Sequence, residues 1–216
     1  SHASSAVDGG IATAIADLRA AQCAFDLAPA WCTADQHQPW HRDRCLVQAV
    51  KATAPQLVHL HGLWRSPTRI ATHLAAAGLP LVIAPHGMLD PGALAMSRRK
   101  KQLVWRLWER RALGSARCFH ALCTAEAKAI RALLPRVPIA VIPNGVALPQ
   151  VSDAALSAAS PWAGAIPSGE SVLLFLSRFH RTKGLDPLLS AWQAVAPAAA
   201  RHCSWLALVG YGDEDA

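Results

Sequence analysis

Short apolar runs alternate with helical patterns along most of the chain, and this alternation restricts the fold more than any other feature. The apolar runs are continuous rather than interleaved with polar residues, which is typical of strands buried on both faces. Strands of this kind form a parallel sheet whose faces are covered by helices, with right-handed crossover connections. The sequence therefore predicts an α/β fold with strands at residues 24–30, 56–60, 81–84, 118–122, 139–142, 172–176 and 204–209.

Helical patterns occupy the intervals between these runs. They predict helices at residues 42–53, 68–77, 98–113, 124–134 and 185–195, the fourth capped by Thr124. A further helical pattern begins directly after Gly9 and Gly10. A Gly-Gly pair that opens a helix is normally preceded by a buried strand, whereas residues 1–8 are small and polar. We therefore expect the first strand of this domain to be missing from the chain.

One stretch interrupts the alternation. Residues 147–169 are rich in alanine, serine and proline, which favours a linker with at most one short helix. The sequence thus predicts an α/β domain at residues 1–146, a linker at 147–169, and the beginning of a second α/β domain at 170–216. A strand-helix-strand unit is smaller than a complete Rossmann-like domain, so we expect the second domain to be incomplete.

The charge of the chain favours anionic partners. The formal net charge is +7, which suits nucleotide phosphates, acidic lipid surfaces or nucleic acid. A nucleic-acid-binding domain would need aromatic-basic alternation, zinc-ligand spacing or an RNP-like motif, and the sequence has none of these. We therefore predict no nucleic-acid partner.

Cysteine spacing and apolar run lengths add two expectations. None of the six cysteines forms a C-x-x-C pair or has zinc-finger spacing, so we expect buried, reduced thiols in a cytosolic protein. No apolar run reaches the eighteen or so residues of a transmembrane helix, so we expect any membrane contact to be peripheral.

A basic loop follows the predicted strand at 172–176. It carries Arg178 and Lys183 and ends at Gly184, where backbone can approach a ligand closely. Loops between a strand and a helix are the ligand-binding edge of an open α/β sheet, and a helix N-terminus favours anions. A guanidinium fork and a mobile ammonium together suit a diphosphate. For this loop taken alone, a solvated basic loop is the better interpretation.

Six short motifs, each at the end of a predicted strand or the start of a helix, change that balance. They are Gly9-Gly10, HLHGLW at 59–64, PHGML at 85–89, HALCTAE at 120–126, IPNGV at 142–146 and RFHRTKG at 178–184. In this order they resemble the retaining glycosyltransferases of the GT-B fold, in the group-four family. The likeness runs over nearly the whole chain. With this resemblance, a diphosphate-binding role for the loop at 178–184 is favoured over a solvated basic loop.

The resemblance implies a Rossmann-like N-terminal domain that binds the acceptor and the beginning of a second Rossmann-like domain that binds a nucleotide-sugar donor. It implies transfer of the sugar, with retention, to a hydroxyl of a sugar or lipid-linked acceptor during polysaccharide or glycolipid biosynthesis. No metal ion or other cofactor is expected, because basic side chains and helix N-termini neutralise the leaving diphosphate. The implied location is cytoplasmic, at the inner face of the membrane, with an anionic membrane surface as a further partner.

The resemblance also assigns donor-side residues. Arg178 and Lys183 match the diphosphate-binding pair, where they would stabilise charge that builds on the leaving group. Gly184 belongs to the same donor loop, and Ser177 stands where the family usually has glycine. Gly9 and Gly10 match the glycine loop that approaches the donor phosphate from the other domain, with an ordinary tight turn as the alternative.

On the acceptor side, His86 matches a histidine close to the reacting sugar, where it is a candidate catalytic and acceptor-binding residue. His61 is a second acceptor-binding candidate at a strand end. His59 and His61 should lie on one face of their strand, yet no neighbouring acid or cysteine completes a metal site, so packing is favoured for His59. Glu126, in the first turn of its helix, is at least as well explained by a structural role.

The basic cluster at residues 98–111 has two equally good interpretations. It contacts an anionic membrane or a lipid-diphosphate acceptor, or it is a solvated helix with snorkelling side chains. On an ideal helical wheel, Lys100 and Arg111 fall within the arc of the apolar residues.

The donor domain of the family continues to a Glu-x₇-Glu motif, which the sequence up to Ala216 does not contain. Two interpretations of the chain therefore stay open. It is part of an active glycosyltransferase, or it is an inactive remnant that binds sugar or lipid.

Overall fold

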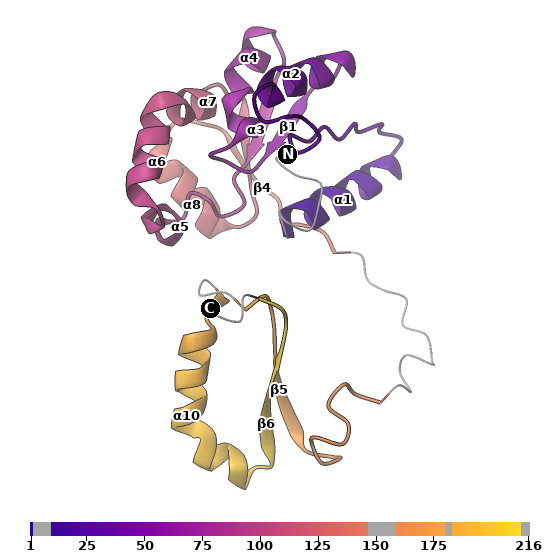
Figure 1. The fold of residues 1–216 in the computed structure, drawn as a ribbon, viewed down its shortest axis with the longest axis vertical. Helices are drawn as coiled ribbons and strands as arrows, with labels where there is room; N and C mark the ends of the chain where they lie inside the picture. Colours follow the sequence, from indigo (N-terminus) through magenta and orange to yellow (C-terminus); the bar gives the residue numbers. More distant parts are fainter. Residues whose placement is uncertain (2–9, 147–158, 180–182, 213–216) are drawn as a thin grey trace. The chain divides into compact units, whose positions relative to one another are not determined.

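The computed structural model describes residues 1, 10–146, 159–179 and 183–212. The chain divides into two compact units, Ser1–Leu148 and Pro149–Ala216 (Figure 1). The predicted linker falls at the beginning of the second unit. Its residues 147–158 lie outside the described part, and residues 159–169 contain turns and no helix.

The first unit is built on a four-stranded parallel sheet. Its strands are β1 (Val58–His61), β2 (Leu81–Ala84), β3 (Cys118–Ala121) and β4 (Ile139–Val141), in the spatial order β1-β2-β3-β4. Each strand pairs with the next in parallel, for example Val58 with Leu81 and Phe119 with Ile139. The predicted parallel α/β fold is confirmed, and all four carboxyl ends meet at one edge of the sheet.

The strand predicted at 24–30 is wrong. Residues 24–26 form a turn after the first helix, and 27–30 have no regular structure. Phe25 and Leu27 are exposed, Asp26 has a φ of 58°, and Pro29 has no N–H to give to a neighbouring strand. The apolar run therefore gains neither burial nor a pairing partner.

Helices fill the connections of the first unit much as predicted (Figure 1). They are α1 (Gly10–Cys23), α2 (Arg42–Ala52), α3 (Ser66–Arg69), α4 (Ala71–Ala76), α5 (Pro91–Ala95), α6 (Arg98–Val104), the π-helical turn η2 (Trp105–Glu109), α7 (Arg110–Gly114) and α8 (Thr124–Leu133). The single helix predicted at 68–77 is two short helices that meet at Ile70. The first begins two residues earlier than predicted, with Pro67 in its first turn. The helix predicted at 98–113 is continuous through α6, η2 and α7, and α5 was not predicted.

The start of α8 corrects another expectation. Cys123, not Thr124, is the N-cap, and its Sγ accepts a hydrogen bond from the Glu126 N–H at 3.5 Å. Thr124 is already the first helical residue. The register shifts by one because Cys123 is the last residue in an extended conformation, with φ at −155° and ψ at 171°. Glu126 therefore occupies the third helical position, where a carboxylate is favoured.

The core of the first unit lies between the sheet and its helices. Phe119, Ile83, Leu74 and Leu113 are fully buried there. Within the described residues, every buried hydrophobic side chain belongs to this unit. The core therefore fixes the positions of the strand ends, and with them the loops that follow β1, β2 and β3.

The second unit contains the predicted strand-helix-strand arrangement. Strand β5 (Ser171–Leu176) pairs in parallel with β6 (Ser204–Val209), and α10 (Leu185–Arg201) connects them. The loops beyond the two strands are held together by the Phe179 N–H, which donates to the Tyr211 carbonyl at 2.7 Å. A side chain at Gly212 would collide with the Phe179 carbonyl oxygen, so glycine is required at that approach.

Two further expectations concern the whole chain. All six cysteines are free, but none is buried, and Cys23, Cys123 and Cys203 are exposed. The expectation of buried thiols is therefore wrong, although the half-buried Cys32 packs against the core of the first unit. Within the described residues, no helix has the length and apolar character needed to cross a membrane.

Candidate functional site

Two histidines meet where β1 and β2 end. The Nδ1 of His61 lies 2.9 Å from the Nε2 of His86, and their rings are stacked with centroids 5.2 Å apart. His61 is the last residue of β1 and is buried, whereas His86 lies two residues beyond β2. The structure thus brings together the two residues that the sequence proposed for the acceptor side.

The backbone around His86 is held in an unusual conformation. His86 has a φ of 53° and Gly87 a φ of 74°, so two successive residues are left-handed. For a residue other than glycine this conformation costs on the order of 1 kcal/mol, and it persists where surrounding contacts impose it.

Glu126 supplies those contacts. Its side chain is buried, and its two oxygens accept hydrogen bonds from the N–H of Gly87 at 2.7 Å and of Leu122 at 2.6 Å. One carboxylate from the start of α8 therefore ties the loop after β2 to the loop after β3. A positioning role for Glu126 follows from these contacts, and they hold His86 against His61.

Two more histidines extend the cluster across the sheet. His120 Nε2 lies 2.7 Å from the carbonyl oxygen of Ile142, and His120 Nδ1 lies 3.3 Å from His59 Nε2. A carbonyl oxygen can only accept, so His120 carries its proton on Nε2 and accepts from His59 when neutral. The rings of His59 and His61 lie 4.1 Å apart, on one face of β1 as predicted. These contacts give His59 the packing and hydrogen-bonding role that the sequence favoured.

Burial favours the neutral form of three histidines in this cluster, His59, His61 and His86. Removal from water, together with the neighbouring His120, lowers the pKa of His59 from 6.5 to about 4. Burial also lowers the pKa of His61 and of His86, although Glu126 acts in the opposite direction on His86. Neutral imidazoles donate one hydrogen bond and accept one, which suits hydroxyl groups. Among the described residues, no group of three or more His, Cys, Asp or Glu is arranged to hold a metal ion.

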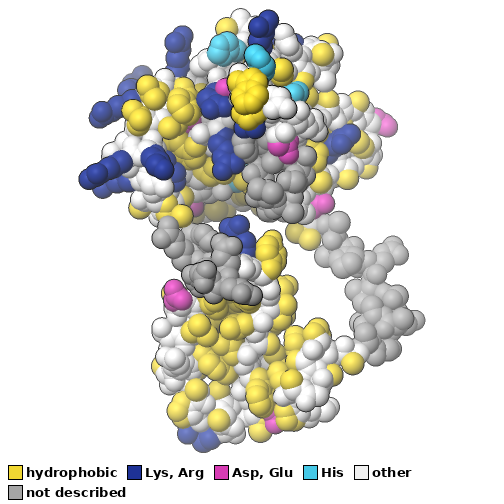
Figure 2. Space-filling view, in the orientation of Figure 1, with side chains coloured by type: hydrophobic (Ala, Val, Ile, Leu, Met, Phe, Trp, Pro, Cys, Tyr) yellow, Lys and Arg dark blue, Asp and Glu magenta, His cyan; other side chains and the backbone are white. Residues whose placement is uncertain are grey.

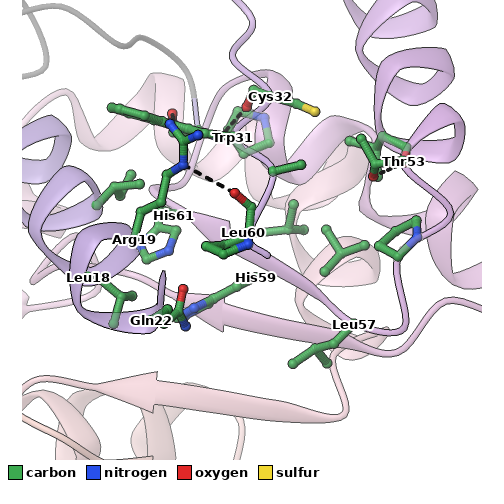
Figure 3. A pocket seen from close by; sticks show the side chains of 18 of the residues that line it. Leu18, Arg19, Gln22, Trp31, Cys32, Thr53, Leu57, His59, Leu60 and His61 are labelled. Carbon is green, nitrogen blue, oxygen red and sulfur yellow. Dashed lines mark hydrogen bonds between the residues drawn. The ribbon is translucent and has the colours of Figure 1, made fainter. Parts of the chain in front are cut away.

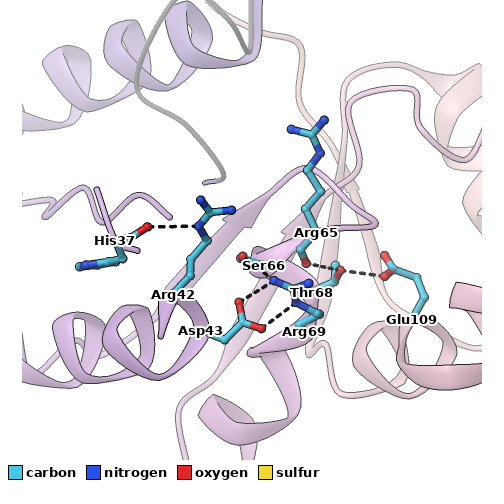
Figure 4. Close-up of polar contacts among 8 residues, drawn as sticks. All are labelled: His37, Arg42, Asp43, Arg65, Ser66, Thr68, Arg69 and Glu109. Atoms are coloured by element: carbon cyan, nitrogen blue, oxygen red, sulfur yellow. Dashed lines mark hydrogen bonds and ion pairs between the residues drawn. The ribbon is translucent and has the colours of Figure 1, made fainter. Parts of the chain in front are cut away.

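A second buried carboxylate, which the sequence did not single out, holds the loop after β1. Glu109 is fully buried and accepts from the Trp64 N–H at 3.1 Å. It also accepts from the Thr68 hydroxyl at 2.8 Å, as Figure 4 shows. Burial raises its pKa. Trp64, like His86, is left-handed, with a φ of 68°. The signal in the sequence was a lone acid in a strongly basic helix.

A cavity of about 410 Å³ in the first unit adjoins two of these histidines, His59 and His61. It lies beside α1 and β1, and Arg19, Gln22, His59 and His61 are among the residues that line it (Figure 3). The Nε of Arg19 donates to the Pro29 carbonyl at 3.1 Å, so this side chain is anchored across the cavity. His61 therefore contacts both His86 and the cavity.

The donor-side candidates lie in the second unit. Arg178 follows β5, and Lys183 and Gly184 precede α10; both basic side chains are exposed. Gly184 has a φ of 76° and is the N-cap of α10, which fits the choice of glycine. Residues 180–182 of this loop are outside the described part. So is Gly9, whereas Gly10 is the first residue of α1.

Residues 17–145 match the family model of the "Glycosyl transferase 4-like domain". The chain belongs to this family. The match covers most of the first unit, including His61, His86, Glu109 and Glu126. The donor-side candidates Arg178 and Lys183 lie outside it, so their assignment rests on their place between β5 and α10.

Two solved structures place this glycosyl transferase 4-like chain in the GT-B fold. Both are UDP-forming α,α-trehalose-phosphate synthases, from Burkholderia xenovorans and Burkholderia vietnamiensis. The first is 14% identical with a TM-score of 0.56, and the match covers 78% of this chain and 42% of that one. The second is 16% identical with a TM-score of 0.56, covering 94% and 49%. The chain thus spans less than half of either synthase, and no curated protein matches it by sequence.

Proposed function

We propose that this chain forms the acceptor side and part of the donor side of a retaining glycosyltransferase. The observation that carries the proposal is the His61–His86 pair at the carboxyl ends of two parallel strands, in a family of glycosyltransferase domains. This edge is where open α/β sheets bind ligands. The neutral imidazoles and the adjoining cavity suit the hydroxyl groups of a sugar acceptor.

The proposed reaction moves a sugar from a nucleotide-sugar donor to an acceptor hydroxyl. The bond from the anomeric carbon to the diphosphate breaks, and its electron pair leaves on the diphosphate. The acceptor oxygen bonds to the same face of that carbon, and the departing diphosphate takes up its proton. Arg178 and Lys183 are assigned to the charge on the diphosphate, and His86 to the sugar hydroxyls. Gly9, Gly10 and Gly184 are assigned to close backbone approach on the donor side.

The comparison with solved structures guides the choice of the first donor to test. Both similar structures are UDP-forming enzymes, which makes a uridine diphosphate sugar the first donor to test. The acceptor class, a sugar or lipid-linked sugar in polysaccharide or glycolipid biosynthesis, remains a prediction from the sequence. So do the cytoplasmic location at the inner face of the membrane and a mechanism without a metal ion or other cofactor.

A binding module without transferase activity is the second candidate. The observation that favours it is the uneven core: within the described residues, all buried hydrophobic side chains lie in the first unit. In that case the histidine edge binds a sugar or lipid ligand, and no product forms. Binding without turnover separates this candidate from the enzyme.

The test is a transfer assay with the purified protein and radiolabelled UDP-, GDP- and ADP-sugars. Lys183→Ala should abolish transfer while the circular dichroism spectrum and melting temperature stay unchanged, because this side chain is exposed. Lys128→Ala, another exposed lysine, is the matched control and should transfer normally. Full turnover by the Lys183→Ala variant would contradict the assignment of the diphosphate pair.

A further inference from the structure

The helical stretch from α6 through η2 to α7 carries an unusual concentration of positive charge. Between residues 98 and 111 it has seven basic residues and one acid, Glu109. That acid is fully buried and faces Trp64 and Thr68, so it neutralises nothing on the outer surface. Six of the basic side chains are exposed: Arg98, Arg99, Lys100, Arg106, Arg110 and Arg111.

Two leucines lie on the same outer surface. Leu103 is 60% exposed and Leu107 is 64% exposed, one helical turn apart. Among the described residues, nothing covers most of either side chain. Figure 2 shows hydrophobic side chains among projecting lysines and arginines on the side of the first unit where Figure 1 places α6. We call Leu103, Leu107 and the six exposed basic residues the Leu-Arg face.

The packing of the helix accounts for this arrangement. Val104 and Trp108 are half-buried toward the unit, and Glu109, the last residue of the π-helical turn, is fully buried. The leucines are thereby separated from the other apolar residues of the helix and left beside Lys100 and Arg111. The apolar residues that share one arc of the ideal wheel thus divide into two groups in the structure. Val104 and Trp108 lie on the inner side of the helix, and Leu103 and Leu107 lie on the outer Leu-Arg face.

We propose that the Leu-Arg face docks this protein onto a membrane surface that contains anionic phospholipids. Apolar side chains flanked by basic ones are what a helix lying in the lipid interface requires: the leucines enter the headgroup boundary and the cations meet lipid phosphates. The charges are complementary, since no exposed acid lies within the face. A single-stranded nucleic acid would instead call for exposed aromatic side chains on which bases stack.

Docking of the Leu-Arg face would bring the loop after β1 close to the membrane. The opposite side of the same helical stretch holds the loop after β1 through the Glu109–Trp64 hydrogen bond. A docked helix therefore keeps that loop, which follows His61, within one helix diameter of the lipid surface. This inference goes beyond the proposed sugar transfer and does not depend on it, because docking is measured without turnover.

The experiment is vesicle flotation of the purified protein. Vesicles of phosphatidylglycerol and phosphatidylcholine should carry the protein upward, whereas vesicles of phosphatidylcholine alone should not. Arg99→Glu/Arg110→Glu should reduce binding by about tenfold or more, given the contribution of each basic residue near an anionic surface. Leu103→Ser/Leu107→Ser should reduce it at unchanged charge, and the remaining binding should be removed by salt.

Matched controls separate the Leu-Arg face from net charge. Lys128→Glu/Arg136→Glu makes the same change in formal charge on exposed residues elsewhere in the first unit and should float like the wild type. Leu133→Ser is the control for an exposed leucine outside the face. Equal losses in the face variants and the control variants would overturn the proposal. So would absence of binding to anionic vesicles, with or without retention of single-stranded DNA at the same salt.

Discussion

The two units use similar strand-helix elements but secure them differently. In the first unit, Phe119 and Ile83 are fully buried, and four strands support the loops that carry His61 and His86. In the second unit, the two strands leave leucines such as Leu173, 51% exposed, on the surface of the unit. Parallel strands are normally covered on both faces, and α10 covers one.

The difference indicates where each kind of function can reside. In the first unit, packing and two buried carboxylates fix the side chains of the site. In the second, Arg178 and Lys183 are exposed, and the loop that carries them is held through backbone hydrogen bonds and close glycine contacts. The first unit offers fixed neutral groups for a ligand, and the second offers cations that can adjust to one.

The largest expected effect comes from the core of the first unit. Phe119→Ala should destabilise it by roughly 3–5 kcal/mol, because a fully buried aromatic ring is lost and a cavity remains. Leu173→Ala in the second unit should cost less than about 1 kcal/mol, since half of that side chain is already in water. Hydrogen exchange resolved by peptide in increasing urea measures the two units separately. Equal effects would mean that Leu173 is covered in solution.

Mild acid should destabilise the first unit through its buried histidines. Between pH 6.5 and about 4, His59 is protonated in the unfolded chain but not in the folded one, so stability falls as pH decreases through this range. The shift corresponds to roughly 3 kcal/mol for His59. His61 and His86 are shifted in the same direction.

His59→Gln is the matched variant for this pH dependence. It removes the titrating group and keeps a donor at the position of Nε2, so unfolding between pH 6.5 and 4 should become less steep. The described part of the second unit has no buried histidine, so its peptides should not respond. An unchanged slope in His59→Gln would show that other groups cause the acid sensitivity.

The two buried carboxylates should differ in a predictable way. Both oxygens of Glu126 face backbone N–H groups, which cannot reverse, so the amide nitrogen of Glu126→Gln would oppose a donor. We expect a loss of about 2 kcal/mol and weaker acceptor binding through His86. One oxygen of Glu109 instead faces the Thr68 hydroxyl, which can turn toward the Arg65 carbonyl and accept from an amide.

Glu109→Gln should therefore cost less than about 1 kcal/mol. Burial already raises the pKa of Glu109, which makes a neutral side chain easier to accept there. Thermal melts of the two variants at pH 7 decide between these expectations. The same loss in both variants would mean that the geometry of the donors does not control the effect.

Sequence patterns predicted the elements better than the contacts between them. Continuous apolar runs identified β1 to β6, because strands buried on both faces have apolar residues at every position. The run at 24–30 is also apolar, but it pairs with no neighbouring strand, and a local sequence pattern does not show whether a pairing partner exists. The partners of Glu109, the Trp64 N–H and the Thr68 hydroxyl, lie 45 and 41 residues away in the sequence, so a local pattern could not identify them. The His59–His120 contact depends on strands 61 residues apart lying near each other in the sheet.

The smallest expected effect on stability belongs to the cations of the second unit, and it separates stability from binding. Arg178→Lys should change the free energy of unfolding by less than about 0.5 kcal/mol, because the side chain is exposed. The variant keeps the charge but loses the planar fork that meets two phosphate oxygens at once, so UDP should bind about tenfold more weakly. Calorimetric titration with UDP measures this loss, and Arg178→Ala should show a larger one. If Arg178→Lys bound UDP as tightly as the wild type, the positive charge alone would be enough to bind the diphosphate, and the planar fork would not be needed. If it unfolded the second unit, the cations would be structural, and the contrast between a fixed first site and an adaptable second one would fail.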